Sequence, residues 1–309
     1  MQSKPQALSK SPQPIPLPSL KQMEKSVTKC QRAGTRQKNI PKTNRKGDSW
    51  PLTSNCHPGT TTPVPPFPMS FNIPTKTMSC ILHIETSTDV CSVALSQDGV
   101  CLHEEIDTNG RRHAEILAPF VEEAVSFADS HAIPLDAVSV SAGPGSYTGL
   151  RIGVSTAKGL CYGRDLKLIS IPTLKVLCTP ILLYREDIPD NALLCPMIDA
   201  RRMEVYTAIY DRALHEVVPT DAVIVNENSI AEILDKQPVF FFGNGADKCR
   251  DTLKHPNAHF IEGIVPKASS MLPLAERALA LNETEDVAYY EPFYLKQFVA
   301  GKSRNLLNG

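Results

Sequence analysis

The sequence predicts an α/β protein of two lobes, because the same order of strands and helices occurs twice along the chain. Each half opens with three strands joined by short turns and continues with alternating helices and strands, which indicates an internal duplication. The turn Gln97-Asp98-Gly99 gives the clearest hairpin signal, since Asp-Gly readily adopts the positive φ angles of two-residue turns. A polar stretch at 186–191 separates the two halves.

The first half shows this order element by element. Apolar runs predict its strands, and apolar residues spaced three and four positions apart predict its helices. The expected strands are 80–87, 90–97, 99–106, 137–142 and 167–171, and the expected helices are about 112–131, 149–163 and 172–184. We assign these elements to a first lobe of residues 78–185.

The second half begins the same order again. The expected strands are 193–199, 203–211, 213–218, 222–226, 239–242 and 258–261, and the expected helices lie near 229–235, 246–254 and 269–281. We assign them to a second, smaller lobe of residues 192–309. Three meandering strands followed by helix, strand and helix form the ribonuclease-H-like order. The duplicated unit therefore predicts the two-lobed fold of the actin-like ATPases.

Residues 1–77 differ in composition from the rest of the chain. They carry 12 Lys and Arg against Glu24 and Asp48, and they hold 13 of the 26 prolines. Such a segment buries too little apolar surface to offset its chain entropy, so we predict a disordered, basic extension. Met78 lies just before the first expected strand, so the extension is also consistent with a start site assigned too early.

Cysteine usage and hydropathy suggest the environment of the protein. The nine cysteines include no C-x-x-C pair, and most lie in apolar patterns, which is typical of a reduced protein without structural zinc. No apolar run reaches the ~20 residues of a membrane span. We expect a cytoplasmic protein that has no membrane span and no metal site.

The glycine-rich segment 141–161 is the most informative part of the chain. Gly143 and Gly145 end a buried strand, Thr148 is the expected helix cap, and Gly149 and Gly153 lie on the helix that follows. A glycine inside a helix costs ~1 kcal/mol relative to alanine, so a bound phosphate or a closely packed surface must offset that cost. The spacing G-x-G-x-x-x-G differs from the dinucleotide-binding fingerprint, and the chain contains no P-loop.

This segment closely resembles the G-P-G-S-[FY]-T-G-L-R-I-G motif of the TsaB family, also called YeaZ. Three later segments, 197–206, 243–246 and 291–296, resemble the same family, so the resemblance covers about residues 78–300. It implies a non-catalytic subunit of the complex that transfers threonylcarbamoyl to N6 of adenosine 37, in tRNAs that read codons starting with A.

The same resemblance implies the partners of the chain. It would activate a catalytic TsaD-type subunit, one of the related Gcp or "glycoprotease" proteins, and would assemble with a TsaE-type ATPase. It would meet tRNA through the complex, and a self-dimer is a further assembly of this family. We expect no tightly bound cofactor, and ATP with Mg²⁺ is expected only at the level of the complex.

Several residues correspond to the nucleotide pocket of actin-like enzymes. Those enzymes place an acidic residue and a glycine on the first hairpin turn, so that backbone amides surround a phosphate. Here Glu85 keeps the carboxylate, but Thr86 brings a β-carbon to the glycine position, and local turn chemistry explains the hydroxyls equally well. The residues expected to form a remnant of this nucleotide pocket are Glu85, Thr86, Ser87, Gly143, Gly145, Arg201, Gly243 and Gly245.

The metal pair of TsaD-type enzymes is missing. Those enzymes carry H-x-x-x-H shortly after the glycine-rich helix, whereas the corresponding stretch 171–178 contains no histidine. His255 and His259 stand four apart, but Pro256 between them argues against a helical pair. We therefore expect no catalytic residue and no metal ligand in this chain.

The helix 112–131 predicts a contact with a partner. Leu117, Val121, Ala124 and Ala128 form a core stripe, and Ile116, Phe120 and Phe127 widen it beyond one sheet contact. A deeply buried helix is the alternative, but the resemblance favours helix-on-helix association in the first lobe. The predicted partner residues are Ile116, Phe120 and Phe127, together with His113, Gly149, Gly153 and Ala157.

Two other functions stay open at this point. An active phosphotransferase or ATPase of the same fold would bind ATP tightly as an isolated chain. A metallopeptidase, the older label of the "glycoprotease" proteins, would hold a stoichiometric metal.

Overall fold

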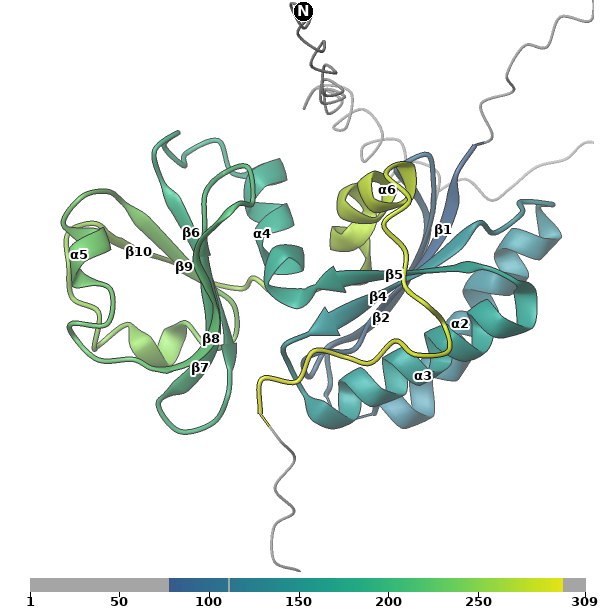
Figure 1. Cartoon of the computed structure of the whole chain (residues 1–309), viewed down its shortest axis with the longest axis horizontal. Coiled ribbons are helices and arrows are strands. Elements are labelled where there is room, and N and C mark those ends of the chain that lie inside the picture. The colour runs from purple at the N-terminus through teal and green to yellow at the C-terminus, as the bar shows by residue number, and fades with distance from the viewer. Residues whose placement is uncertain (1–77, 111, 297–309) are drawn as a thin grey trace, which may run out of the picture.

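A computed structural model describes residues 78–110 and 112–296, so the predicted extension 1–77 lies outside the described residues. The described chain forms two lobes, each built on a five-stranded sheet (Figure 1). Lobe 1 contains β1 (Cys80–Glu85), β2 (Cys91–Gln97), β3 (Val100–Asp107), β4 (Ala137–Gly143) and β5 (Lys167–Pro172). Lobe 2 contains β6 (Leu193–Asp199), β7 (Glu204–Tyr210), β8 (Glu216–Ile224), β9 (Val239–Phe242) and β10 (Ala258–Ile261).

The two sheets have the same topology. Their spatial orders are β3-β2-β1-β4-β5 and β8-β7-β6-β9-β10, so β6 corresponds to β1 and β9 to β4. In both sheets the first strand pairs antiparallel with the second and parallel with the fourth. This is the ribonuclease-H-like order in duplicate, which confirms the predicted two-lobed actin-like ATPase fold.

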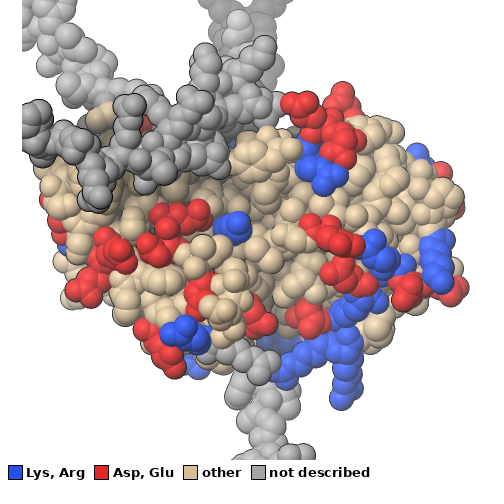
Figure 2. All heavy atoms as spheres, turned by 180° about the vertical axis from the view of Figure 1, so that it is seen from behind, with Lys and Arg blue, Asp and Glu red and all other residues tan. Residues whose placement is uncertain are grey.

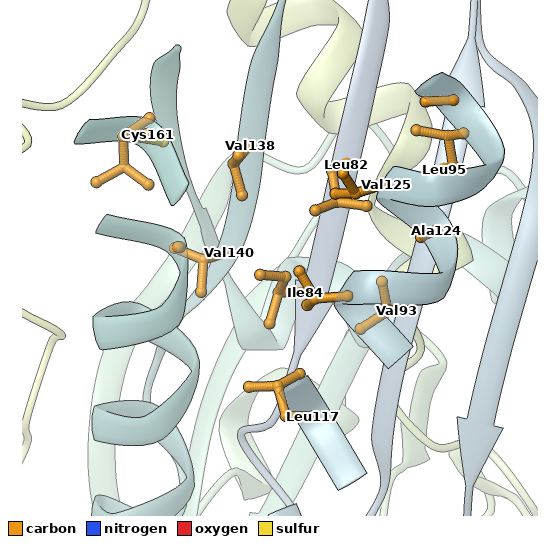
Figure 3. Packing of buried hydrophobic residues seen from close by; sticks show 14 of the residues in the cluster. Leu82, Ile84, Val93, Leu95, Leu117, Ala124, Val125, Val138, Val140 and Cys161 are labelled. Carbon is orange, nitrogen blue, oxygen red and sulfur yellow. The ribbon is translucent and has the colours of Figure 1, made fainter. Parts of the chain in front are cut away.

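Lobe 1 is organised around β1, whose six residues are all buried. Helices α2 (His113–Ser130) and α3 (Tyr147–Arg164) cover one face of its sheet. Figure 3 shows Leu117, Ala124 and Val125 of α2 directed at strand residues such as Leu82 and Ile84. Apolar residues on both faces of the central strands make this core, as expected for strands covered on both sides.

The predicted division between the lobes is wrong for two helices. Helix α4 (Thr173–Tyr184) is shared between the lobes, since its Leu177 and Ile181 pack in the core of lobe 2 while its Val176 packs in the core of lobe 1. Conversely, the 3-10 helix η2 (Ala268–Met271) and helix α6 (Leu272–Ala280) return to lobe 1, where Ala275 packs with Ile81. Helix α4 therefore lies between the two sheets, and α6 packs on the sheet of lobe 1. The boundary at 185–192 therefore separates the sheets but not the helices.

Local elements of lobe 2 also differ from expectation. The strands expected at 213–218 and 222–226 form one strand, β8, which pairs with β7 across two register shifts. A short helix α5 (Ala231–Leu234) occupies the segment expected at 229–235, and the helix expected at 246–254 is reduced to the 3-10 turn η1 (Asp247–Cys249).

The segment 285–296, here called the C-terminal strap, crosses from lobe 1 to lobe 2. The Glu285 amide donates to the Leu168 carbonyl oxygen over 2.8 Å, and the Phe293 amide donates to that of Ala142 over 2.7 Å. At its end, Lys296 forms an ion pair with Glu204 of β7. Figure 1 shows the strap in yellow, running past α3 toward the space between the lobes. The strap therefore contacts both lobes.

Among the described helices, none combines the length and the apolar character that crossing a membrane requires.

Candidate functional site

The turn that follows β1 is closed by its own side chains. The Ser87 amide donates to Oε1 of Glu85 over 2.6 Å, and the Thr86 amide donates to Oγ of Ser141 over 3.4 Å. Glu85, Thr86 and Ser87 are all fully buried. The two amides that a phosphate would need at this turn are therefore engaged inside the chain.

The glycine-rich segment packs directly on this turn. A β-carbon on Gly145 would lie 2.3 Å from the Ser87 carbonyl oxygen, and one on Gly149 would lie 2.1 Å from that of Thr86. The Ser146 amide donates to the Ser87 oxygen over 2.6 Å. No side chain fits at these separations, so the glycines are required by contact within lobe 1.

Helix α3 begins two residues earlier than expected. Ser146, rather than Thr148, is the N-cap, and its side chain accepts a hydrogen bond from the Gly149 amide. The Thr86 hydroxyl donates to the Gly149 carbonyl oxygen over 2.9 Å, and a β-carbon on Gly153 would meet Oγ1 of Thr86 at 2.2 Å. Thr86 therefore fills the space beside the helix that a phosphate-binding turn would leave open.

Gly149, Gly153 and Ala157 are thus not available to a partner. All three are buried, with the two glycines against Thr86 and Ala157 in the lobe 1 core. The prediction that they form a partner interface is wrong, because the small side chains let α3 approach its own sheet. The cost of helical glycine is offset by this intrachain packing.

Burial also determines the charge state of the turn. Removal from water raises the pKa of Glu85 to about 7, and hydrogen bonds from Ser87 oppose that rise only in part. Two residues earlier, burial lowers the pKa of His83 to about 3, and the ring lies between the hydroxyls of Ser139 and Ser96. A neutral imidazole and a carboxyl that is easily protonated therefore lie on one strand.

Lobe 2 repeats the glycine arrangement. Gly243 ends β9 with a φ of 98°, as Gly143 ends β4 with a φ of 103°. A β-carbon on Gly245 would lie 2.8 Å from the carbonyl carbon of Ile198, next to the β6–β7 turn. Both predicted glycine pairs therefore position a turn of their own lobe, which reflects the duplication.

Arg201 lies at the tip of the β6–β7 hairpin. Its φ of 73° and that of 51° at Arg202 form the tight turn, and both side chains are exposed. The Arg201 amide donates to the carboxylate of Asp199 over 3.1 Å. The structure thus places Arg201 on a different lobe from Glu85, Thr86 and Ser87, which are buried in lobe 1.

A cavity of about 340 Å³ lies between the lobes. Gly143 and Pro144 line it from lobe 1, Glu216 and Thr220 line it from β8, and Phe293 of the C-terminal strap forms part of its wall. Of the predicted pocket residues, only Gly143 borders this cavity. The cavity is mainly apolar and carries one acidic side chain, which does not suit a polyphosphate.

The predicted partner residues of α2 differ in accessibility. His113 is buried and its Nε2 lies 3.2 Å from the Val90 carbonyl oxygen of the same lobe, so its assignment to a partner interface is wrong. Ile116, Phe120 and Phe127 are half-buried at the edge of the lobe 1 core. These three keep apolar surface exposed beside the core.

Sequence reasoning missed two glycines of α3 that face outward. A β-carbon on Gly159 or Gly163 would meet no atom within 4 Å. Both lie inside the helix, where glycine is unfavourable, and nothing in the described chain packs on them. Their spacing of four residues was the available signal, because it places both on one helix face.

Comparison with known proteins identifies the family. The family described as "TsaD: tRNA N6-adenosine threonylcarbamoyltransferase" matches residues 105–302. The tRNA threonylcarbamoyladenosine biosynthesis protein TsaB of Escherichia coli is 32% identical over 229 residues, covering 72% of this chain and 96% of that protein. The chain belongs to the TsaB family. A TsaB of Haemophilus influenzae is 29% identical over 236 residues, covering 72% of this chain and 95% of its own length.

Solved structures agree with this assignment. YeaZ from Pseudomonas aeruginosa superimposes with a TM-score of 0.60 at 28% identity, covering 71% of this chain and all of the YeaZ chain. A second structure, described as similar to peptidase YEAZ and from the same organism, gives a TM-score of 0.61 at 27% identity. These two structures therefore share the fold of this chain.

Proposed function

We propose that this chain is a non-catalytic subunit of the complex that transfers threonylcarbamoyl to N6 of adenosine 37 in tRNA. It would act as the partner and activator of a TsaD-type enzyme, alongside a TsaE-type ATPase. The names of the TsaB relatives support a role in threonylcarbamoyladenosine biosynthesis. The proposal that catalysis belongs to the partner subunit is supported by the residues of this chain.

The closed turn at Glu85–Ser87 is the observation that carries this proposal. Phosphate sites are built from free backbone amides and open glycines. Here the Thr86 and Ser87 amides donate to side chains, and the glycines of the neighbouring segment touch the turn itself. The site where an actin-like enzyme would hold a nucleotide phosphate is filled by the protein.

The position of the TsaD-type metal pair is also filled. The stretch 171–178 runs from the end of β5 into α4, where Leu174, Leu177 and Cys178 are buried in the core of lobe 2. Apolar side chains therefore occupy most of the buried positions of this stretch. This supports the assignment of the transfer chemistry to the partner.

The outer surface of α2 and α3 is the proposed partner face. Ile116, Phe120 and Phe127 expose apolar area on α2, and Gly159 and Gly163 leave α3 open to close approach. Apolar helices with outward glycines suit helix-on-helix packing with a partner. A TsaD-type subunit or a second copy of this chain would use the same face.

Contact with tRNA is proposed to occur through the complex. Figure 2 shows acidic and basic side chains interspersed over the rear face, with a group of Lys and Arg at its lower right edge. An interspersed surface attracts a nucleic acid backbone less than a continuous basic stripe does. The visible charge pattern therefore supports a scaffold role over independent tRNA binding.

The test is reconstitution with a TsaD-type subunit and a TsaE-type ATPase. A Gly159→Leu variant should fold normally, because its side chain enters open space, but should lose association and modification activity together. Glu232→Leu, an exposed position on α5 of lobe 2, serves as the matched control and should retain both. Normal association of Gly159→Leu would contradict the partner face.

A nucleotide titration of the isolated chain tests the non-catalytic assignment separately. We expect no ATP binding at micromolar concentration. Tight, magnesium-dependent binding that Thr86→Gly strengthens would favour an active ATPase or phosphotransferase instead.

A further inference from the structure

A bulge in β3 changes which residues of this edge strand face α2. Leu95 pairs with His103, but the next residue, Ser96, pairs with Cys101, so Leu102 is an extra residue in β3. Leu102 packs against the core beneath α2, and the ring of its neighbour His103 stacks on Phe127 of α2. Two consecutive residues thus face the same helix, as a bulge permits.

Beyond the bulge, the side chains of β3 again alternate between the two faces of the sheet, which places a carboxylate beside His103. Glu105 follows His103 by two residues and shares its face, whereas Glu104 reaches the opposite side, where its Oε1 accepts from the Ser269 amide. From α2, Glu123 lies one helical turn before Phe127. One ligand-type atom from each of His103, Glu105 and Glu123 lies within 4.8 Å of the other two.

The imidazole of this cluster is poorly satisfied. Nε2 of His103 is buried and has no hydrogen-bond partner among the described residues. Its distance to Oε1 of Glu105 is 3.6 Å, too long for a hydrogen bond. The His103 side chain is only 17% exposed, so solvent does not readily replace the missing partner.

The two carboxylates lack a compensating charge. Within the described part of the chain, neither Glu105 nor Glu123 forms an ion pair with a lysine or arginine, and the ion-pair contact of Glu105 is with His103. Glu105 is half-buried and Glu123 is exposed. Two carboxylates close together repel one another, and one cation between them removes that repulsion. The ring of His103 is held by Phe127, with centroids 5.6 Å apart, so its nitrogen stays directed at the pair.

We propose that His103, Glu105 and Glu123 form a binding site for a divalent metal ion of the zinc class. One imidazole nitrogen and two carboxylate oxygens form a ligand set for Zn²⁺, with ligand distances near 2.0–2.2 Å. Ligand atoms that bind one tetrahedral Zn²⁺ lie ~3.4 Å from each other, and the torsional freedom of the glutamate side chains allows them to close to that separation from within 4.8 Å. Three protein ligands leave a fourth position for water or for a group from another molecule.

This site is independent of the proposed function and differs from the prediction that the chain has no metal ligand. No spacing motif in the sequence indicates it, since His103 and Glu105 lie on a bulged strand and Glu123 lies on a helix, 18 residues after Glu105. Its place next to Phe127 puts the open coordination position at the margin of the proposed partner face.

The experiment titrates the full-length, metal-free chain with Zn²⁺ by calorimetry and with Co²⁺ by visible absorption. His103→Gln and Glu123→Gln should each weaken Zn²⁺ binding at this site at least tenfold and abolish the corresponding Co²⁺ band. His131→Gln is the matched control, because His131 stacks on the same Phe127, at 4.3 Å, but lies outside the cluster. It should bind Zn²⁺ as the wild type does.

Two further outcomes are expected if Zn²⁺ binds at this site. Zn²⁺ should raise the melting temperature of the wild type and of His131→Gln, but not of Glu123→Gln, an exposed and isosteric change that leaves the fold intact. Mg²⁺ at millimolar concentration should not displace Zn²⁺, because an imidazole ligand favours the zinc class. Equal Zn²⁺ binding by His103→Gln and His131→Gln, or ready displacement by Mg²⁺, would overturn the site.

Discussion

Gly149 lies so close to Thr86 that a β-carbon on the glycine would stand 2.1 Å from the threonine carbonyl oxygen. The Thr86 hydroxyl in turn donates to the Gly149 carbonyl oxygen over 2.9 Å. The two residues therefore lock α3 to the turn after β1. Because they touch, no open space is left between the turn and α3.

The first prediction compares two glycines of α3. Gly149→Ala should lower the free energy of unfolding by several kcal/mol, because the new methyl group overlaps a buried carbonyl oxygen. Gly159→Ala should raise it by up to ~1 kcal/mol, because alanine is the better helix former and its methyl group enters open space. Urea unfolding of the isolated chain measures both. Equal effects of the two substitutions would show that α3 does not touch the turn.

The second prediction concerns pH. The folded-state pKa of Glu85, at about 7, lies above its ordinary value of 4.5, so folding favours the protonated form. Its contribution to stability is complete below pH 4.5 and is lost as pH rises toward 7. Glu85→Gln removes this loss, so the stability of the variant relative to the wild type should increase between pH 4.5 and 7 and then stay constant.

His83 gives the opposite dependence over much of the same range. Its folded-state pKa of about 3 lies below its ordinary value of 6.5, so stability is lost as pH falls below 6.5. Between pH 4.5 and 6.5 the two groups offset one another in the wild type. In Glu85→Gln the acid-induced loss should therefore become steeper. Parallel pH profiles of the two proteins would show that Glu85 is ionised in the folded protein over this whole pH range.

The third prediction concerns the exposed apolar part of α2. Phe120→Asp should weaken association with a TsaD-type partner or a second copy, because a charge in a dry helix contact is costly. Ser126→Asp, an exposed position on the same helix, should leave association unchanged. Size-exclusion chromatography of each variant with its partner measures the effect. Unfolding of Phe120→Asp would mean that Phe120 serves the core of lobe 1 alone.

The fourth prediction concerns the C-terminal strap. Lys158 of α3 donates to the carbonyl oxygens of Ala288 and Tyr290 over 3.1 and 2.9 Å. Lys158→Met keeps the apolar stem but removes both hydrogen bonds, so limited proteolysis should cut within 285–296 several times faster. Lys254→Met, in lobe 2, should leave the cleavage rate unchanged. An unchanged cleavage rate in Lys158→Met would show that other contacts keep the strap in place.

The sequence alone determined the duplicated order of elements and the family. Alternating apolar runs, the Asp-Gly hairpin and the glycine-rich segment are local features, and local propensity is sufficient to predict them. Most strand limits in lobe 1 were predicted to within two residues for the same reason. The apolar stripe of α2 was also predicted from residue type and spacing, whereas the burial of Glu85 was not.

Only the tertiary structure decided what those residues touch. Residue type did not show that Gly149 and Gly153 face their own lobe while Gly159 faces outward, because both faces of α3 carry small residues. The packing of α4 between both lobes and of α6 on lobe 1 depends on which sheet face is left uncovered, a property of the assembled fold. The bulge at Leu102 likewise arises from pairing between strands, and it alone brings His103 to Glu123. Contacts between distant segments, which no local pattern encodes, therefore set the chemistry of these sites.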